Sequence, residues 1–280
     1  MVASDLAEGS PRARLGWDDG TPRLNTDHDR VDPTPILQRV DADQYRLRVP
    51  VPFPISHCHC CGADEPPQQS AVLWPELVDE WGLSTTEAES VDRREGQFCP
   101  VCQASLRSAS LALAITRSMG WRGPLASWVD SGPTLRLLEV NRAGNLTQWL
   151  ERLPGHQLVE YPHVDLQSMT FSSRTWDLIV HSDTLEHVDD PIAALHECAR
   201  LLDSGGCLCF TIPIISGRMT RRRDSLPPSY HGLSSDPIYR VVTEYGADFW
   251  SQLFESDFDH VELVPLQWPD AVAVIARPRW

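Results

Sequence analysis

The sequence predicts an α/β protein in which a doubly wound, mostly parallel sheet follows a small N-terminal module. From residue 135 onward, short apolar runs alternate with stretches of helical periodicity, as the strands and crossover helices of such a sheet do. Before that point, five of the eight cysteines lie within residues 58–102, a clustering that indicates a metal-binding module. A chain of 280 residues has room for both parts.

Three segments are expected along the chain. Residues 1–45 are rich in Asp, Arg, Pro, Gly and Thr and show no apolar period, which predicts a flexible tail. Residues 46–105 form the cysteine-rich module, and residues 106–280 form the main domain. The run LRSASLALAITRSM, Leu106–Met119, has the spacing and composition of a helix.

The main domain is predicted from its alternation of strands and helices. Six strands are expected, at Leu135–Val140, Gln157–Glu160, Trp176–His181, Cys207–Ile212, His260–Val264 and Ala271–Ala276. Helices are expected at Leu146–Leu153, Pro191–Leu202 and Ala247–Glu255. The second of these helices follows two aspartates, begins with proline and ends at Gly205-Gly206, which are start and stop signals. The layout is Rossmann-like and predicts a ligand at the carboxyl ends of the strands.

Two Cys-x2-Cys pairs define the small module. Such pairs suit tetrahedral thiolate coordination, so we expect a zinc-ribbon-like module with one structural Zn²⁺ held by Cys58, Cys61, Cys99 and Cys102. His57, His59 and Cys60 are alternative ligands, and a set of unligated buried thiols is the alternative to a metal site.

Charge and hydropathy limit the partners of the protein. The formal net charge is −15, which disfavours a nucleic-acid partner. No apolar stretch approaches the roughly 20 residues of a membrane span, and the N-terminus lacks the apolar core of a signal peptide. We therefore expect a cytoplasmic protein with neither a nucleic-acid nor a membrane partner.

The turn after the first strand, EVNRAGN, is unusual for a nucleotide-binding fold. Three glycines are expected there, because the backbone turns sharply and approaches the ligand closely, but only Gly144 is present. Asparagine adopts positive φ more readily than most residues, and alanine adds little bulk. The turn departs from the glycine-rich pattern, but its residues can still adopt the backbone conformation that a cofactor loop needs.

The segment WDLIVHSDTLEHVDDP, Trp176–Pro191, carries a resemblance to a known family. It resembles the fourth strand and following helix of class I S-adenosylmethionine-dependent methyltransferases, in which Leu-Glu-His-Val follows an acid-containing turn. A Gly-Gly turn and a Phe-Thr-x-Pro strand follow in the family, and here they are Gly205-Gly206 and Phe210–Pro213. PSYHG (228–232) and TEYGADFW (243–250) resemble later segments of a branch that often carries an N-terminal cysteine-rich module. The resemblance covers residues 135–280 and implies a methyltransferase with S-adenosyl-L-methionine as cofactor.

The resemblance also implies which residues of the first loop bind the cofactor. Glu139 matches the acid that ends the first strand of the family. The glycine positions then fall at Asn141, Ala143 and Asn145, or a one-residue gap puts Gly144 at the last of them. Among these, Glu139, Asn141 and Gly144 are predicted to contact the cofactor.

Two further acids are expected to bind the nucleoside. Glu160 follows Glu139 by 21 positions, the interval expected of a ribose-hydroxyl acceptor. Asp165 resembles the family acid that accepts from the adenine amino group, with a turn or cap role as the alternative. Because only five positions separate these acids, either a strand–helix unit is deleted or Gln157–Glu160 is the third strand and the second is lost.

The remaining candidates lie at the end of the third predicted strand and in the later loop. His181, Ser182 and Asp183 are expected near the cofactor. His231, with Tyr230 beside it, is the preferred catalytic base, and a loop histidine without catalytic function is the alternative. His187 is a second candidate for a catalytic residue, and a structural role is an equal alternative for it.

The acceptor is expected to be a small molecule or a sugar-like compound. The basic segment Arg218–Arg223 suits an anionic group, although a solvated loop is the alternative. Two other functions stay open: a cofactor-binding relative that no longer methylates and acts as a partner or regulatory subunit, and methylation of a protein or nucleic acid with the zinc module as docking element.

Overall fold

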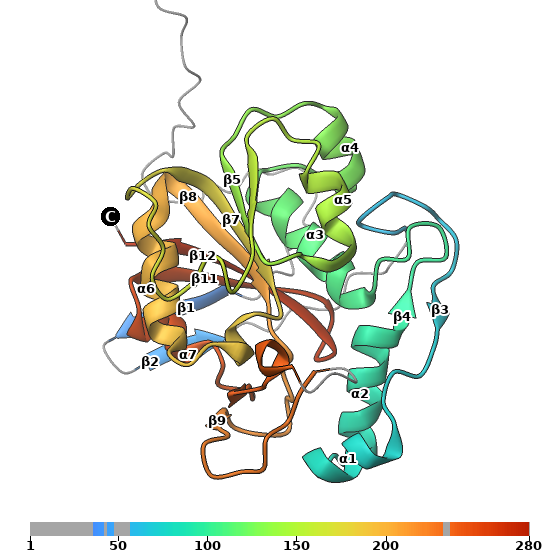
Figure 1. Cartoon of the computed structure of the whole chain (residues 1–280). Coiled ribbons are helices and arrows are strands. Elements are labelled where there is room, and N and C mark those ends of the chain that lie inside the picture. The colour runs from blue at the N-terminus through green and yellow to red at the C-terminus, as the bar shows by residue number, and fades with distance from the viewer. Residues whose placement is uncertain (1–35, 42–43, 48–56, 232–235, 280) are drawn as a thin grey trace, which may run out of the picture. The chain divides into compact units, whose positions relative to one another are not determined.

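The computed structural model describes residues 36–41, 44–47, 57–231 and 236–279 (Figure 1). The chain divides into two units, residues 1–32 and 33–280. The first unit lies outside the described residues, and so does most of the predicted tail. The described residues all belong to the second unit.

An eight-stranded sheet forms the centre of this unit, in the order β2-β1-β11-β12-β8-β7-β5-β6. Four adjacent strands are parallel: β6 His156–Val159, β5 Leu137–Val140, β7 Trp176–Ser182 and β8 Leu202–Thr211. The other four pair antiparallel: β12 Ala271–Pro278, β11 Phe258–Gln267, β1 Ile36–Asp41 and β2 Gln44–Leu47. The predicted class and all six predicted strands are confirmed. Strands β1 and β2 differ from the expectation, since the predicted tail reached residue 45.

The pairing of β6 resolves which strand of the family pattern is missing. Strand β6 lies parallel and directly beside β5, with His156 opposite Leu137, and so takes the position of the second strand. Residues 160–175, all of them described, contain no strand before β7 begins. A third strand would need two crossovers of a dozen or more residues each, one before it and one after it, so these 16 residues are too few.

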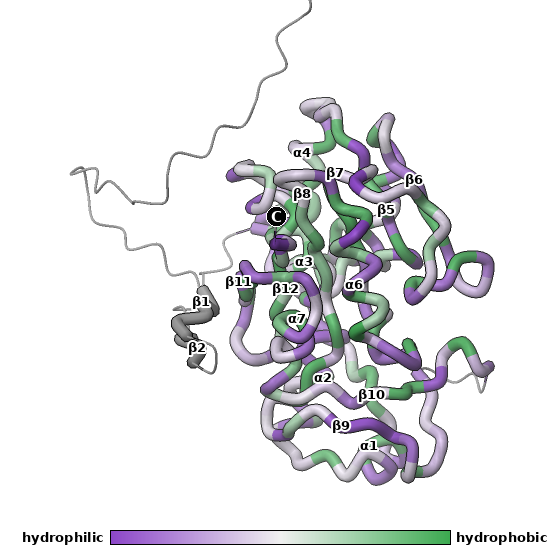
Figure 2. Tube along the Cα trace, turned by 90° about the vertical axis from the view of Figure 1, so that its left-hand side faces the viewer, coloured by the Kyte–Doolittle hydropathy of each residue, from purple (hydrophilic) through white to green (hydrophobic). Residues whose placement is uncertain are grey.

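Helices cover both faces of the sheet (Figure 1). One face packs against α3 Leu106–Ser118, α4 Leu125–Asp130 and α5 Thr147–Leu150. The other packs against α6 Pro191–Leu201 and α7 Ser251–Glu255. Central strands buried on both faces need apolar side chains throughout, and Figure 2 shows hydrophobic stretches along β7 and β8.

The predicted helices are present, with altered ends. The helix predicted at Leu146–Leu153 is a single turn, α5, preceded by a 3₁₀ turn at Gly144–Leu146. Helix α6 begins as expected, with the Asp190 carboxylate accepting from the Ala193 amide at 3.0 Å. Its end differs, because Leu202 passes directly into β8 and the Gly205 turn, at φ +82°, lies inside that strand.

The N-terminal module adds elements that the sequence patterns did not predict. Helix α1 spans Pro75–Trp81 and α2 spans Thr85–Gly96. A short pair of strands, β3 Gln68–Gln69 and β4 Gln97–Phe98, closes the module. A second pair, β9 Arg221–Arg222 and β10 Thr243–Glu244, lies in the later loop region. Within the described ranges, no helix has the length and apolar character needed to cross a membrane.

Candidate functional site

The four predicted zinc ligands converge. Cys58 Sγ lies 3.7 Å from Cys102 Sγ, and Cys61 Sγ lies 3.8 Å from Cys99 Sγ. All four sulfurs lie within 4.8 Å of one another, and Cys60 does not belong to the group. Thiolates bonded at about 2.3 Å to a tetrahedral Zn²⁺ lie roughly 3.8 Å apart. The residues present therefore fit a zinc ion.

The two halves of this cluster have the same backbone geometry. In each, the amide of the first cysteine donates to a carbonyl five residues on, Ala63 or Ala104, at 2.8 and 3.0 Å. The residue after the second cysteine has positive φ, +84° at Gly62 and +61° at Gln103. Burial raises the pKa of Cys61, and the Ala63 amide opposes that effect. Two such turns facing each other are typical of a structural zinc site.

The loop after β5 has the backbone of a glycine-rich loop. Asn141 has φ +56° and Gly144 has φ +57°, whereas Ala143 has φ −77°. Asparagine thus stands where positive φ is required. Glu139 is fully buried and faces inward, where its carboxylate accepts from the Ala143 amide at 2.8 Å. The same carboxylate also contacts Thr147 Oγ1 at 2.5 Å and His156 Nε2 at 2.7 Å, so Glu139 holds the loop in shape.

The Asn141 side chain bridges the ends of two neighbouring strands. Its Oδ1 accepts from the Tyr161 amide at 3.0 Å, and its Nδ2 lies 3.5 Å from Thr184 Oγ1. Glycine would leave this space open. The bridge is therefore a specific departure from a glycine-rich cofactor loop.

The two predicted nucleoside acids have different surroundings. Glu160 is 46% exposed and lies 3.4 Å from the Arg142 guanidinium, a position from which it can accept from a ligand hydroxyl. Asp165 accepts from the amide and side chain of Gln167 at 2.9 and 3.1 Å. Asp165 thus stabilises a turn, which is the alternative role that the sequence allowed besides a contact with adenine.

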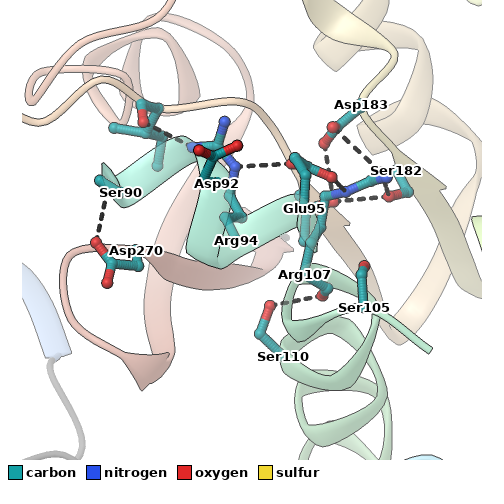
Figure 3. Close-up of polar contacts among 12 residues, drawn as sticks. Ser90, Asp92, Arg94, Glu95, Ser105, Arg107, Ser110, Ser182, Asp183 and Asp270 are labelled. Carbon is teal, nitrogen blue, oxygen red and sulfur yellow. Dashed lines mark hydrogen bonds and ion pairs between the residues drawn. The ribbon is translucent and has the colours of Figure 1, made fainter. Parts of the chain in front are cut away.

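The carboxyl end of β7 holds a partly buried ion-pair network (Figure 3). Arg107 of α3 lies between Glu95 of α2, at 2.8 Å, and Asp183, at 3.1 Å, and it donates to Ser182 Oγ at 2.8 Å. Asp183 has φ +47°, a strained conformation of the kind that gathers at functional sites. Burial acts to raise the pKa of Glu95, but Arg107 and Arg94 lower it to about 2.

His181 differs from the two residues that follow it. It is fully buried against Phe210, at 4.8 Å between ring centroids, and neither ring nitrogen has a hydrogen-bond partner in the described structure. Burial lowers the pKa of His181 to about 3. The ring is therefore neutral at pH 7.

The two predicted catalytic histidines meet at a buried glutamate. His187 Nε2 and His231 Nδ1 each lie 3.5 Å from Oε1 of Glu186, whose side chain is 0% exposed. The histidine rings pack edge to face at 4.8 Å, and Tyr230 adjoins His231 in the chain. Burial raises the pKa of Glu186 well above its ordinary range and lowers that of His231 to about 3.

The N-terminal module reaches this edge of the sheet. Trp81 of α1 stacks on His231 at 6.4 Å and donates to Ser229 Oγ at 2.8 Å. Arg94 of α2 donates to the Ile214 carbonyl at 2.8 Å. A cavity of about 80 Å³ opens beside the cysteine cluster, but none of the carboxyl-edge residues named above lines it.

The arginines of the basic segment all have protein partners. Arg218 pairs with Glu87 at 2.8 Å, and Arg221 and Arg223 both pair with Glu244. Arg222 pairs with Asp224 at 3.1 Å. These side chains act as structural cations, and the anionic acceptor stays a prediction without support from them.

Comparison with known proteins places a methyltransferase match on this sheet. Residues 123–210 match the family described as methyltransferase domain. The ubiquinone biosynthesis O-methyltransferase of Nitrosomonas europaea is 29% identical over 98 residues, which are 35% of this chain and 38% of that relative. The chain therefore aligns with well under half the length of this curated relative.

Solved methyltransferase structures are similar at low identity. A possible histamine N-methyltransferase of Thermotoga maritima is 15% identical, with 52% of this chain and 84% of that chain covered and a TM-score of 0.34. The trans-methyltransferase CalH, solved with SAH, is 13% identical, with 63% of each chain covered and a TM-score of 0.36. Because these TM-scores are low, the fold is assigned from the strand order of this protein and not from the neighbours.

The parallel strands and their carboxyl-edge loops define a doubly wound α/β protein of the nucleotide-binding type. The match to known families agrees with this class of fold: residues 123–210, less than a third of the chain, are similar to a methyltransferase domain.

Sequence reasoning missed three residues of the site. Glu95 and Arg107 belong to helices far from the matched motif, and no local pattern marks them. Glu186 was visible inside Leu-Glu-His-Val, but its approach to His231, 45 positions later, depends on the fold.

Proposed function

We propose that this protein transfers a methyl group from S-adenosyl-L-methionine to a small-molecule acceptor at the carboxyl edge of the sheet. The observation that carries the proposal is the register of β5 with β7, which pairs Val140 with His181. This register brings the loop at Asn141 beside the turn at Asp183. These are the two strand ends at which a doubly wound sheet binds its ligand.

Three groups of residues have distinct roles in this proposal. The Asn141–Gly144 loop and Asp183 line the methionine end, and Glu160 accepts from the ribose hydroxyls. Glu139 supports cofactor binding indirectly, by holding the shape of the Asn141–Gly144 loop. Asp165 does so indirectly as well, by stabilising the turn at Gln167. His187, His231 and Tyr230 lie on the acceptor side.

When bound, the cofactor supplies a methyl carbon activated by its sulfonium. The chain has to align the acceptor with that carbon, and such positioning accounts for much of the rate. An acceptor hydroxyl also has to lose a proton. Burial lowers the pKa of both His187 and His231, so at neutral pH both rings are uncharged and able to accept it.

The four-cysteine cluster belongs to the proposal as a structural zinc site. Zinc held by four protein sulfurs has no open position and stabilises the fold around it. We infer that residues 46–105 form this module and residues 106–280 the methyltransferase domain. The contacts of α1 and α2 with the carboxyl edge support a role for the module in closing the acceptor side.

The Asn141 bridge favours a second candidate, a relative that binds its ligand without methylating. Its side chain spans the space that glycine leaves open at the strand ends. In that case the protein acts as a partner or regulatory subunit.

Calorimetric titration with S-adenosyl-L-methionine tests the proposal. We expect a dissociation constant on the order of micromolar to 100 micromolar. Glu160→Gln should weaken binding about tenfold, because it removes a charge-assisted hydrogen bond. Glu151→Gln, a change of an exposed carboxylate at the end of α5, is the matched control and should bind as the wild type does. An absence of heat and of thermal shift at millimolar cofactor would contradict the proposal.

A further inference from the structure

Two groups of side chains among the described residues converge closely enough to hold an ion. One is the four-cysteine cluster. The other is Glu186 with His187 and His231, whose ligand atoms all lie within 4.8 Å of one another. The proposed methyl transfer does not require these three side chains to lie so close together.

The carboxylate of Glu186 lacks the partners that a buried carboxylate needs. Its side chain is 0% exposed, and neither oxygen has a hydrogen-bond partner in the described structure. A buried carboxyl without a partner costs several kcal/mol in general, so native proteins pair such groups or bind them to metals. The Glu186 carboxylate therefore points to a ligand.

The distances fit an ion better than hydrogen bonds. Each histidine nitrogen lies 3.5 Å from Glu186 Oε1, beyond the 2.7–3.2 Å range of N–H···O bonds. Two ligands bonded at about 2.1 Å to a tetrahedral ion lie roughly 3.4 Å apart. Each histidine nitrogen is thus spaced from the carboxylate oxygen as two ligands of one ion are, and all three atoms lie within 4.8 Å of one another.

The orientation of His187 is that of a metal ligand. Its Nδ1 lies 2.9 Å from the Arg240 carbonyl, which can only accept, so Nδ1 carries the proton. Nε2 then presents its lone pair to Glu186. Metal-binding histidines usually donate their second N–H to a carbonyl in this way.

His231 is held in place from two sides. Its backbone amide donates to the Tyr239 carbonyl at 2.9 Å, and Trp81 stacks on its ring. The N-terminal module thus contributes to the geometry of the cluster.

We propose that Glu186, His187 and His231 form a binding site for a borderline divalent transition-metal ion such as Zn²⁺, separate from the four-cysteine site. Two imidazoles and one carboxylate suit such ions, and three protein ligands leave coordination positions open. The site is inferred from the geometry of these three residues and not from methyl transfer, and the histidines accept a proton only in the ion-free form.

Metal analysis of the full chain tests this site. After dialysis against a mild chelator and titration with Co²⁺, the wild type should bind two equivalents. One should give the intense sulfur-to-cobalt charge-transfer bands of a thiolate site, and the second should add only weak bands. Glu186→Gln and His231→Gln should each lose the second equivalent and keep the first.

His196→Gln is the matched control, because His196 is 45% exposed on α6 and pairs with Asp257. It should bind two equivalents. His231→Gln decides the test if Glu186→Gln fails to fold, since His231 is 34% exposed and tolerates replacement better. One equivalent in the wild type, or two in a folded His231→Gln variant, would overturn the proposal. Cofactor titration of the same samples reports separately on the proposed function.

Discussion

The four-cysteine cluster and the Glu186–His187–His231 cluster are built in opposite ways. The cysteines come from two short turns with the same backbone geometry, so the local sequence contains nearly everything that the site needs. The second cluster joins a 3₁₀ turn after β7 to a loop 44 residues later, and α1 supports it from a third direction. A site made of local turns can be predicted from spacing, whereas a site made by the fold cannot.

The largest expected effect concerns the local cluster. Cys99→Ser should abolish zinc binding and destabilise the protein by several kcal/mol, because the metal-binding free energy of a structural site is folding free energy. Thermal unfolding and metal analysis check this. Cys60→Ala is the control, since Cys60 is buried beside the cluster but outside it. Zinc loss in Cys60→Ala would show that the ligand set is wrong.

The next effect concerns the link between the module and the carboxyl edge. Arg107→Gln leaves the Asp183 carboxylate without its cation and Glu95 with Arg94 alone, and it should cost about 3 kcal/mol in unfolding free energy. Denaturant unfolding of this variant and of Arg107→Gln with Glu95→Gln measures the coupling, and the double change should cost less than the sum of the single changes. Arg136→Gln removes two ion pairs, with Asp177 and Asp203, from a side chain that is 46% exposed, and it should cost under about 1 kcal/mol. Equal losses for Arg107→Gln and Arg136→Gln would contradict a stabilising role of the partly buried network.

A smaller effect is expected at the first loop. Asn141→Ala should destabilise the protein by about 1–2 kcal/mol, because alanine is strained at φ +56°. Asn141→Gly keeps that backbone and should cost about 1 kcal/mol for the lost side-chain bonds. If the wild type fails to bind S-adenosyl-L-methionine and Asn141→Gly binds it, the non-methylating candidate is the better one.

The smallest effect concerns the ion pair that docks α2. The Arg218 guanidinium lowers the pKa of Glu87 from its ordinary value near 4.5 to about 2. A lowered folded-state pKa stabilises the protein above the unfolded value, so this contribution is complete above about pH 4.5 and is lost as the pH falls toward 2. Glu87→Gln keeps the cap at Ser84 and should cost about 1 kcal/mol at pH 7. The difference from wild type, followed by thermal unfolding, should vanish near pH 2; a constant difference would contradict it.

Most of the fold was predictable because its signals are local. The alternation of apolar runs located all six strands, and the Leu-Glu-His-Val segment led to the cofactor class. The four cysteines were predicted as one set, and the structure brings them together. Helices α1 and α2 were missed because they bury few residues of their own.

The candidate site was predictable only in part. Asn141 was expected to adopt positive φ and does so, but the bridge from its side chain to Tyr161 depends on the position of β6. The Arg107 network joins three elements that are distant in sequence. No spacing rule reports such contacts, because they arise only when the sheet is assembled.

Anomalous diffraction at the zinc absorption edge, from crystals grown with Zn²⁺, tests the contrast between the two clusters most directly. We expect two peaks per chain, one among the sulfurs of Cys58, Cys61, Cys99 and Cys102 and one beside Glu186 Oε1, His187 Nε2 and His231 Nδ1. A map with a peak at the sulfurs alone would contradict the second site, and a map with no peak at the sulfurs would contradict the first.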